Sequence, residues 1–228
     1  LKGEKDYLFV GFSIRFLPSA SVMNYLKEKG KGAQEKVVAF GNPEYEGGKP
    51  ALTYAEKEVR AIAQEFPESN VLVGKNATET VFKKVGSHFN YIHLATHGIF
   101  EADSPLASGL LLTKDSENDG LLSGEELYSL HLNADLVTLS ACETGLSKIS
   151  SGDDLVGLTR GFLYAGSKAI VASLWSVDDA ATSYLMTQFY SNLKKTNARD
   201  ALREAQIAAK QKYQHPFYWA AFQLIGQA

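Results

Sequence analysis

The chain has 228 residues, a formal net charge of −3, 45% hydrophobic and 21% charged residues, and a single cysteine. This composition is typical of a globular domain with one substantial core, and the weak negative charge excludes the basic footprint of a nucleic-acid-binding protein. No apolar run approaches the roughly 18 residues of a membrane-spanning helix. One cysteine excludes an internal disulfide and a multi-cysteine metal site, so we expect a protein of the reducing cytoplasm with no membrane contact.

The first 35 residues differ in pattern from the rest of the chain. Residues 7–23 alternate apolar and polar side chains around a glycine, which predicts two short strands. We expect residues 1–35 to be a strand-rich segment that belongs either to the domain that follows or to a lost upstream region. Because the chain opens at Leu1 without methionine, we interpret it as a fragment of a longer protein.

From residue 36 to 228 the pattern alternates between short strands and helices. Runs rich in Val, Ile and Leu predict strands that are buried on both faces, as in a parallel sheet. The expected strands are 37–41, 70–74, 109–113, 168–174, 219–225 and two runs that end at His97 and Cys142. The expected helices are 53–66, 78–85, 123–130, 153–165, 178–194 and 198–213. This alternation predicts an α/β fold, a three-layer α/β/α sandwich around a mostly parallel sheet.

Two capping boxes mark expected helix starts, Thr53 with Glu56 and Ser123 with Glu126. The acidic turn at 114–120 has the spacing of a calcium-binding loop. The residues before the turn, however, are typical of a strand and not of the helix that such a loop requires. We therefore expect no metal and no cofactor.

The runs that end at His97 and Cys142 carry the side chains best suited to chemistry. Ligands bind at the carboxyl ends of neighbouring parallel strands, so an imidazole and a thiol there could share one crevice. A thiol beside an imidazole can act as a nucleophile, and the backbone N–H groups of Gly98 and Cys142 could hold an oxyanion. Two alternatives remain open: a lone cysteine is often a small buried hydrophobe, and His93 on the same strand is expected to be a supporting core histidine.

Six motifs between residues 93 and 226 resemble the CHAT domain family, and the resemblance covers about residues 36–226. The motifs are His93-Leu-Ala-Thr-His97-Gly98, Ser108-Gly-Leu-Leu-Leu-Thr113, Asn133-Ala-Asp-Leu-Val-Thr-Leu-Ser-Ala-Cys142-Glu-Thr-Gly145, Asp154-Leu-Val-Gly-Leu-Thr-Arg-Gly-Phe-Leu-Tyr-Ala-Gly166, Ser173-Leu-Trp175-Ser-Val-Asp-Asp179 and His215-Pro-Phe-Tyr-Trp-Ala-Ala-Phe-Gln-Leu-Ile-Gly226. Members are caspase-like cysteine peptidases, related to separase and often fused behind tetratricopeptide repeats. The resemblance implies that His97 is the base, that Cys142 is the nucleophile, and that Gly98 and Cys142 form the oxyanion hole.

The segment that ends at Asp179 also resembles the corresponding segment of separase, in which the last aspartate selects the P1 residue. The resemblance therefore implies that Asp179 pairs with an arginine or lysine of the substrate, with Asp154 and Trp175 as further candidates for the P1 pocket. From local pattern alone, at least one of Asp178 and Asp179 should cap the helix that follows.

We expect a cysteine endopeptidase that cleaves protein substrates after a basic residue and is regulated by an attached repeat domain or a partner protein. The alternative is a non-catalytic module of the same fold that binds a peptide. Lys148, in the Gly/Ser loop 145–152, is a candidate for self-cleavage if P1 is basic.

Overall fold

The computed structural model describes residues 7–19, 35–45, 51–99, 101, 103–104, 106–140, 154–175 and 177–227, with residues 154–156 described by their backbone alone. Cys142 and the loop 145–152 with Lys148 lie outside the described residues. Among the described ranges, no helix is both long and apolar enough to cross a membrane.

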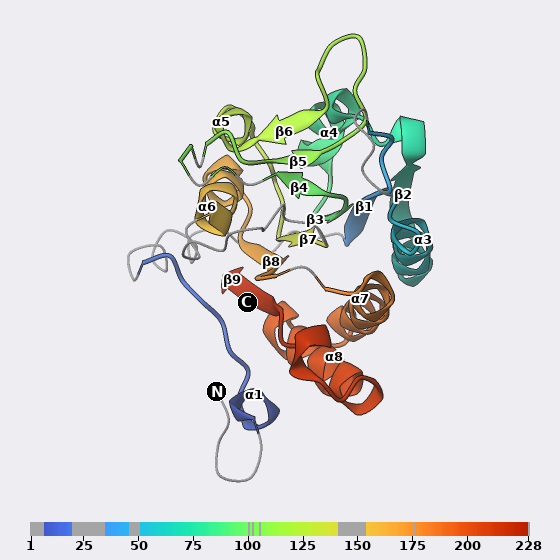
Figure 1. Cartoon of the computed structure of the whole chain (residues 1–228), viewed down its shortest axis with the longest axis vertical. Coiled ribbons are helices and arrows are strands. Elements are labelled where there is room, and N and C mark those ends of the chain that lie inside the picture. Colours follow the sequence, from blue (N-terminus) through green and yellow to red (C-terminus); the bar gives the residue numbers. More distant parts are fainter. Residues whose placement is uncertain are drawn as a thin grey trace.

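A six-stranded sheet with the order β2-β1-β3-β7-β8-β9 forms the centre of the molecule (Figure 1). The strands are β1 (Lys36–Gly41), β2 (Glu68–Val73), β3 (Tyr91–Ala95), β7 (Leu136–Leu139), β8 (Ala169–Ser173) and β9 (Phe222–Gly226). All neighbouring pairs are parallel except β8 with β9, which is antiparallel. The predicted mostly parallel sheet is therefore confirmed.

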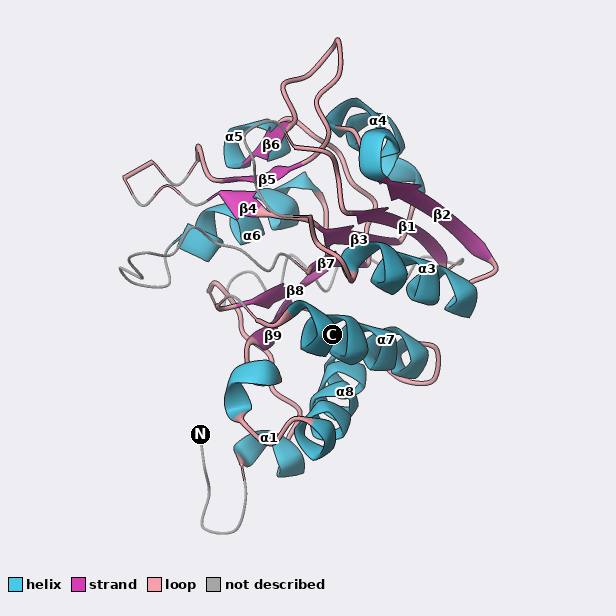
Figure 2. Ribbon diagram, turned by 45° about the vertical axis from the view of Figure 1, so that its right-hand side comes forward, coloured by secondary structure: helices cyan, strands magenta, loops and turns pink. Residues whose placement is uncertain are grey.

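Helices cover both faces of this sheet, which gives three layers (Figure 2). One face packs on α4 (Glu79–Val85), α5 (Gly124–Leu127) and α6 (Asp154–Ala165). The other face packs on α3 (Ala55–Glu65), α7 (Asp179–Leu193) and α8 (Ala198–Lys212). Alternate residues of each strand enter opposite cores, because successive side chains point to opposite faces: Ile92 and Leu94 pack on the α4–α6 side, and Ala95 packs on the α3 side.

A small second sheet contains the residues that follow His97. It consists of three antiparallel strands, β4 (Gly98–Ile99), β5 (Gly109–Leu111) and β6 (Leu121–Ser123). Leu110 and Leu122 of this sheet are buried in the core on the α4–α6 side. The expected strand at 109–113 therefore exists, but it belongs to this second sheet and not to the central one.

The two predicted capping boxes have different outcomes. Ser123 and Glu126 form the expected reciprocal pair at the start of α5. The Thr53 box is wrong, because α3 begins only at Ala55 and its N-cap is Tyr54. The Tyr54 N–H donates instead to the Asp179 carboxylate at 2.8 Å, so a neighbouring helix supplies the acceptor that the local sequence was expected to supply.

The described part of the N-terminal segment does not form the two predicted strands. Its regular element is the single helical turn α1 (Leu8–Gly11), and Phe16 forms one isolated bridge with Ile225 of β9. Tyr7 and Phe9 pack on the ring of Trp219, each with ring centroids 5.0 Å apart. Tyr7 and Phe9 are thus partly buried against the main domain, while Leu8, Phe12 and Phe16 stay exposed, so the apolar positions of this segment do not form a buried strand face.

Candidate active site

Several candidate site residues lie at one edge of the central sheet. Because β1, β3, β7 and β8 are parallel, their carboxyl ends meet at the same edge. His97 comes two residues after β3, and Asp179 follows β8. On β7 the pairing continues past the strand, since the Ser140 N–H donates to the Leu94 carbonyl at 2.9 Å. Cys142, two residues farther along the chain, is outside the described residues.

His97 is fully buried at the junction of the two sheets. Its backbone carbonyl accepts a hydrogen bond from the Leu111 N–H at 2.8 Å, and Gly98, the next residue, begins β4 opposite Leu110. The Tyr45 ring lies against the imidazole, with ring centroids 5.0 Å apart and an interplanar angle of 64°. The imidazole therefore lies at the point where the chain leaves the central sheet and enters the small sheet.

Asp179 lies at the start of α7, where its half-buried carboxylate accepts the Tyr54 N–H. Burial raises the pKa of this carboxyl, and the negative charges of Glu58 and Asp178 raise it further. The Tyr54 hydrogen bond and the charge of His97 act in the opposite direction. Within the part of the chain that the structure describes, no Lys or Arg forms an ion pair with Asp179.

The other acidic and aromatic candidates have distinct environments. Asp178 is the N-cap of α7, where its carboxylate accepts the Ala181 N–H at 2.9 Å, which confirms the expectation that one of the two aspartates caps this helix. Trp175, just beyond β8, is partly buried, and its indole N–H donates to the Phe217 carbonyl at 3.0 Å. Asp154 is the first residue of α6, and its side chain is outside the described part of the structure.

His93 lies in a buried polar network beneath this edge, as expected for a core histidine. Its Nε2 is 2.8 Å from Glu58 Oε1, and its Nδ1 is 3.3 Å from the Tyr190 hydroxyl, which donates to Thr138 at 2.9 Å. All four side chains are essentially inaccessible to solvent. The network therefore links α3, β3, α7 and β7 to one another.

Replacing His93 with leucine should lower the free energy of unfolding by about 3–5 kcal/mol, because Glu58 would remain buried without its partner. The double variant Glu58→Leu/His93→Leu should regain most of this loss, since two apolar side chains of similar size need no polar partner. Urea denaturation of both single variants and the double variant measures the effect. A double variant less stable than either single variant would contradict this account of the pair.

The acidic turn carries no candidate calcium site. Glu117 pairs with Lys84 at 3.0 Å, Glu126 pairs with Lys83 at 2.9 Å, and Asp115 accepts hydrogen bonds from Thr80 and from the turn itself. Lysines of α4 thus neutralise these carboxylates. Across the described residues, no group of three or more His, Cys, Asp or Glu is arranged to hold a metal ion.

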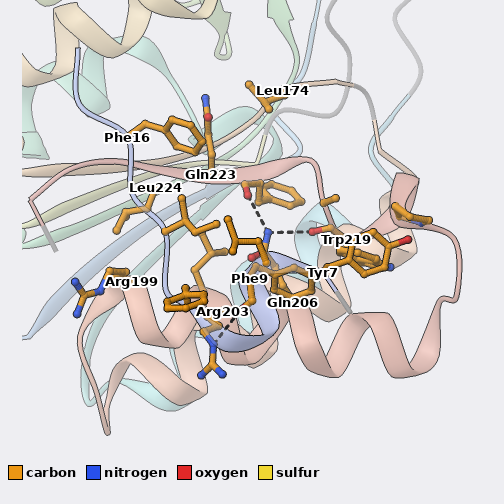
Figure 3. Close-up of a pocket in the computed structure, with 17 residues that line it drawn as sticks. Tyr7, Phe9, Phe16, Leu174, Arg199, Arg203, Gln206, Trp219, Gln223 and Leu224 are labelled. Carbon is orange, nitrogen blue, oxygen red and sulfur yellow. Dashed lines mark hydrogen bonds between the residues drawn. The ribbon is translucent and has the colours of Figure 1, made fainter. Parts of the chain in front are cut away.

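A pocket of about 500 Å³ lies elsewhere, between residues 7–16, α8 and the β9 edge of the sheet (Figure 3). It is mainly apolar, and none of the expected site residues lines it. Two of its polar side chains already donate to backbone carbonyls, Gln206 to Trp219 and Phe222 and Arg203 to Phe9. The pocket therefore does not contribute to the site at the carboxyl edge.

Sequence reasoning missed Tyr45, which touches His97. The available signal was its position: it follows β1 closely, and β1 is adjacent and parallel to β3. An aromatic residue just beyond a neighbouring parallel strand lies at the same sheet edge as the candidate base.

A family model of the CHAT domain matches residues 1–227 of the chain. The chain belongs to the CHAT domain family. Tetratricopeptide repeat protein 28 of Mus musculus and that of Homo sapiens are each 37% identical to this CHAT domain over 109 residues, which is 46% of the chain. The match covers 4% of the length of these relatives, so the chain corresponds to a small part of each.

Solved structures show the same fold. Separase in the Saccharomyces cerevisiae separase–securin complex matches 95% of this CHAT domain with a TM-score of 0.64 at 15% identity, and the match covers 14% of the separase chain. The Arg-specific cysteine proteinase gingipain R matches 85% with a TM-score of 0.57 at 11% identity, over 46% of its own chain. The fold is therefore that of caspase-like peptidases, as expected.

Proposed function

We propose that this CHAT domain is a cysteine endopeptidase in which His97 and Cys142 form the catalytic dyad. The observation that carries the proposal is the position of His97 beyond the carboxyl end of β3, beside the strand that leads to Cys142. Covalent geometry keeps the Cα of Cys142 within about 7.6 Å of the Cα of Ser140, because only two peptide units separate them. Ser140 itself is bonded to β3 through the Leu94 carbonyl.

The reaction follows from the chemistry of these groups. His97 takes the thiol proton, and the Cys142 thiolate attacks the carbonyl carbon of the scissile peptide bond. The backbone N–H groups of Gly98 and Cys142 donate to the oxyanion, and the protonated His97 then gives its proton to the leaving amine. The C–N bond breaks, and the acyl group stays on Cys142 as a thioester. Water, deprotonated by His97, then attacks the thioester. The C–S bond breaks, which releases the acid product and regenerates the Cys142 thiolate. No metal or cofactor takes part in these steps.

We further propose that Asp179 selects an arginine or lysine at P1, with Trp175 and Asp154 as neighbouring parts of the pocket. A half-buried carboxylate whose pKa is raised by burial, and which forms no ion pair with a Lys or Arg among the described residues, is suited to pair with a substrate cation. Gingipain R, which shares the fold, is named as Arg-specific. One carboxylate oxygen is bonded to the Tyr54 N–H, which fixes the orientation of the group.

Regulation by an attached repeat domain is part of the same proposal. The curated relatives are named tetratricopeptide repeat proteins, and the separase neighbour was solved in complex with securin. We infer that repeats in the same polypeptide, or a partner protein, gate access to His97 and Cys142, and that the domain acts in the cytoplasm.

A peptidyl-arginine chloromethyl ketone tests the dyad directly. The wild-type protein should gain the mass of one peptidyl group on Cys142, as measured by intact and peptide mass spectrometry. Cys142→Ala should gain none, and His97→Ala should react much more slowly, since less of its thiol would be ionised. If Cys142 is not labelled, or if its labelling rate does not depend on His97, the dyad is wrong.

The complete burial of His97 favours a second candidate, a non-catalytic module whose sheet edge binds a peptide. Such a module would leave the Cys142 thiol inert toward the same ketone and would still bind peptides reversibly. The labelling experiment therefore separates the two functions.

A further inference from the structure

We propose that Tyr45 is the positioning residue of His97: its ring packs on the imidazole while its hydroxyl bonds to Thr96, the residue directly before His97. This inference rests on the proposed function, since it concerns the orientation of the catalytic base. Tyr45 itself touches neither thiol nor substrate in the mechanism, and it acts through His97.

The first contact is between the two rings. Their centroids are 5.0 Å apart and their planes are inclined at 64°, an edge-on arrangement that aromatic rings favour. Since His97 is fully buried, rotation of its imidazole would have to displace a packed neighbour. The Tyr45 ring thus restricts the rotamers that His97 can adopt.

The second contact is made by the Tyr45 hydroxyl, which lies 3.1 Å from Thr96 Oγ1. Thr96 donates its single hydroxyl proton to the Leu111 carbonyl, so Tyr45 must be the donor in the bond to Thr96. Burial raises the pKa of Tyr45, which keeps this proton in place, although hydrogen bonds with the Thr96 side chain and the His97 backbone lower the pKa. One phenol side chain thus contacts His97 through its ring and bonds to Thr96 through its hydroxyl.

Tyr45 can hold His97 only if its own segment is held. Asn42 has a φ of 46°, and its N–H donates to the Ala95 carbonyl at 3.0 Å, which continues the β1–β3 pairing. The Glu44 N–H donates to Thr113 Oγ1 at 2.9 Å. The segment from Asn42 to Tyr45 is therefore tied to β3 and to Thr113, which lies just after β5, directly before the ring that touches His97.

The consequence for the reaction is one of geometry. A base must lie within hydrogen-bonding reach of the proton that it abstracts, and a displacement of about 1 Å can cost about 10²-fold in rate. Loss of the Tyr45 ring should therefore lower kcat by about 10²-fold and leave KM nearly unchanged, because no substrate contact is lost. Loss of the hydroxyl alone should cost much less, since the ring contact remains.

The experiment compares Tyr45→Leu and Tyr45→Phe with the control Tyr128→Leu. Tyr128 is the C-cap residue of α5, and its ring packs on Tyr164. Steady-state kinetics on a P1-Arg peptide should show kcat about 10²-fold lower for Tyr45→Leu and substantially rescued in Tyr45→Phe, with the control at the wild-type value. Equal kcat in Tyr45→Leu and wild type would overturn the inference, as would a loss that appears only in KM. If Tyr45→Leu does not fold, Tyr45→Phe must still lower kcat without a change in KM.

A measurement independent of activity separates this inference from the proposed function. In protein labelled with ¹³C and ¹⁵N at histidine, the His97 ring signals, assigned with His97→Gln, should shift in Tyr45→Leu and not in Tyr128→Leu. If the wild-type protein shows no turnover and no labelling of Cys142, the proposed function fails, and this spectrum still shows whether the Tyr45 ring contacts the imidazole. Unchanged His97 signals would overturn the inference whatever the activity.

Discussion

Replacing His97 with alanine should lower kcat/KM toward a P1-Arg peptide by about 10³-fold, within the range attributed to general acid–base catalysis. Both the thiol proton and the proton of the leaving amine pass through this imidazole in the proposed reaction. The isosteric His97→Gln should lose a similar factor, because an amide cannot take up the proton at neutral pH.

The control for His97 is His88→Ala, since His88 is exposed in the turn after α4. Its kcat/KM should equal that of the wild type, and thermal denaturation should show that all variants are folded. If His97→Gln keeps wild-type kcat/KM while folded, another group must be the base.

Replacing Asp179 with asparagine should abolish the preference for arginine over its neutral isostere citrulline at P1. Loss of a partly desolvated charge pair costs about 2–5 kcal/mol, which corresponds to roughly 30-fold to 4,000-fold in kcat/KM for the arginine substrate alone. Asparagine keeps an oxygen for the Tyr54 N–H, so the junction of α3 and α7 should persist. Equal losses for both substrates would indicate a structural role instead.

The same aspartate predicts a pH dependence whose direction follows from its pKa. Burial raises the pKa of Asp179 above its ordinary value of 3.8, so the carboxylate takes up its proton at a higher pH than an exposed aspartate does. The ratio of kcat/KM for arginine to that for citrulline should therefore be highest at neutral pH and should fall as the pH is lowered through the raised pKa. Asp179→Asn should make this ratio independent of pH, whereas Asp178→Asn, which removes the neighbouring charge and keeps an oxygen for the Ala181 N–H, should not.

Local sequence patterns predicted most of the central sheet correctly. The apolar runs at 37–41 and 168–174 lie within one residue of β1 and β8, because a strand buried on both faces must be apolar at nearly every position. The capping box of Ser123 and Glu126 was also correct, since both partners lie on the same turn of chain. The alternation predicted two strands, but within residues 7–19 Tyr7 and Phe9 pack on Trp219 while Phe12 and Phe16 remain exposed, so no strand face is buried there.

The candidate site shows the same division between features that local sequence predicts and features that depend on packing. Its placement was expected from the sequence: His97 lies just after β3 and Asp179 lies at the start of the helix that follows β8, and parallel strands end at one edge. Its contacts did not follow, because they join residues far apart in the chain. Examples are Asp179 with the Tyr54 N–H and Glu58 with His93.

By itself, the sequence determined most strands of the central sheet, its main helices, the α/β class and the sheet edge beyond which His97 lies, since each depends on hydrophobic periodicity within a short stretch of chain. Only the tertiary structure decided which groups meet there: the Tyr45 ring on His97, and the Asp179 carboxylate at the start of α3. Such contacts depend on how the layers pack. A hydrogen bond or a ring contact forms only within a narrow range of distances and angles, and no sequence pattern specifies positions that closely.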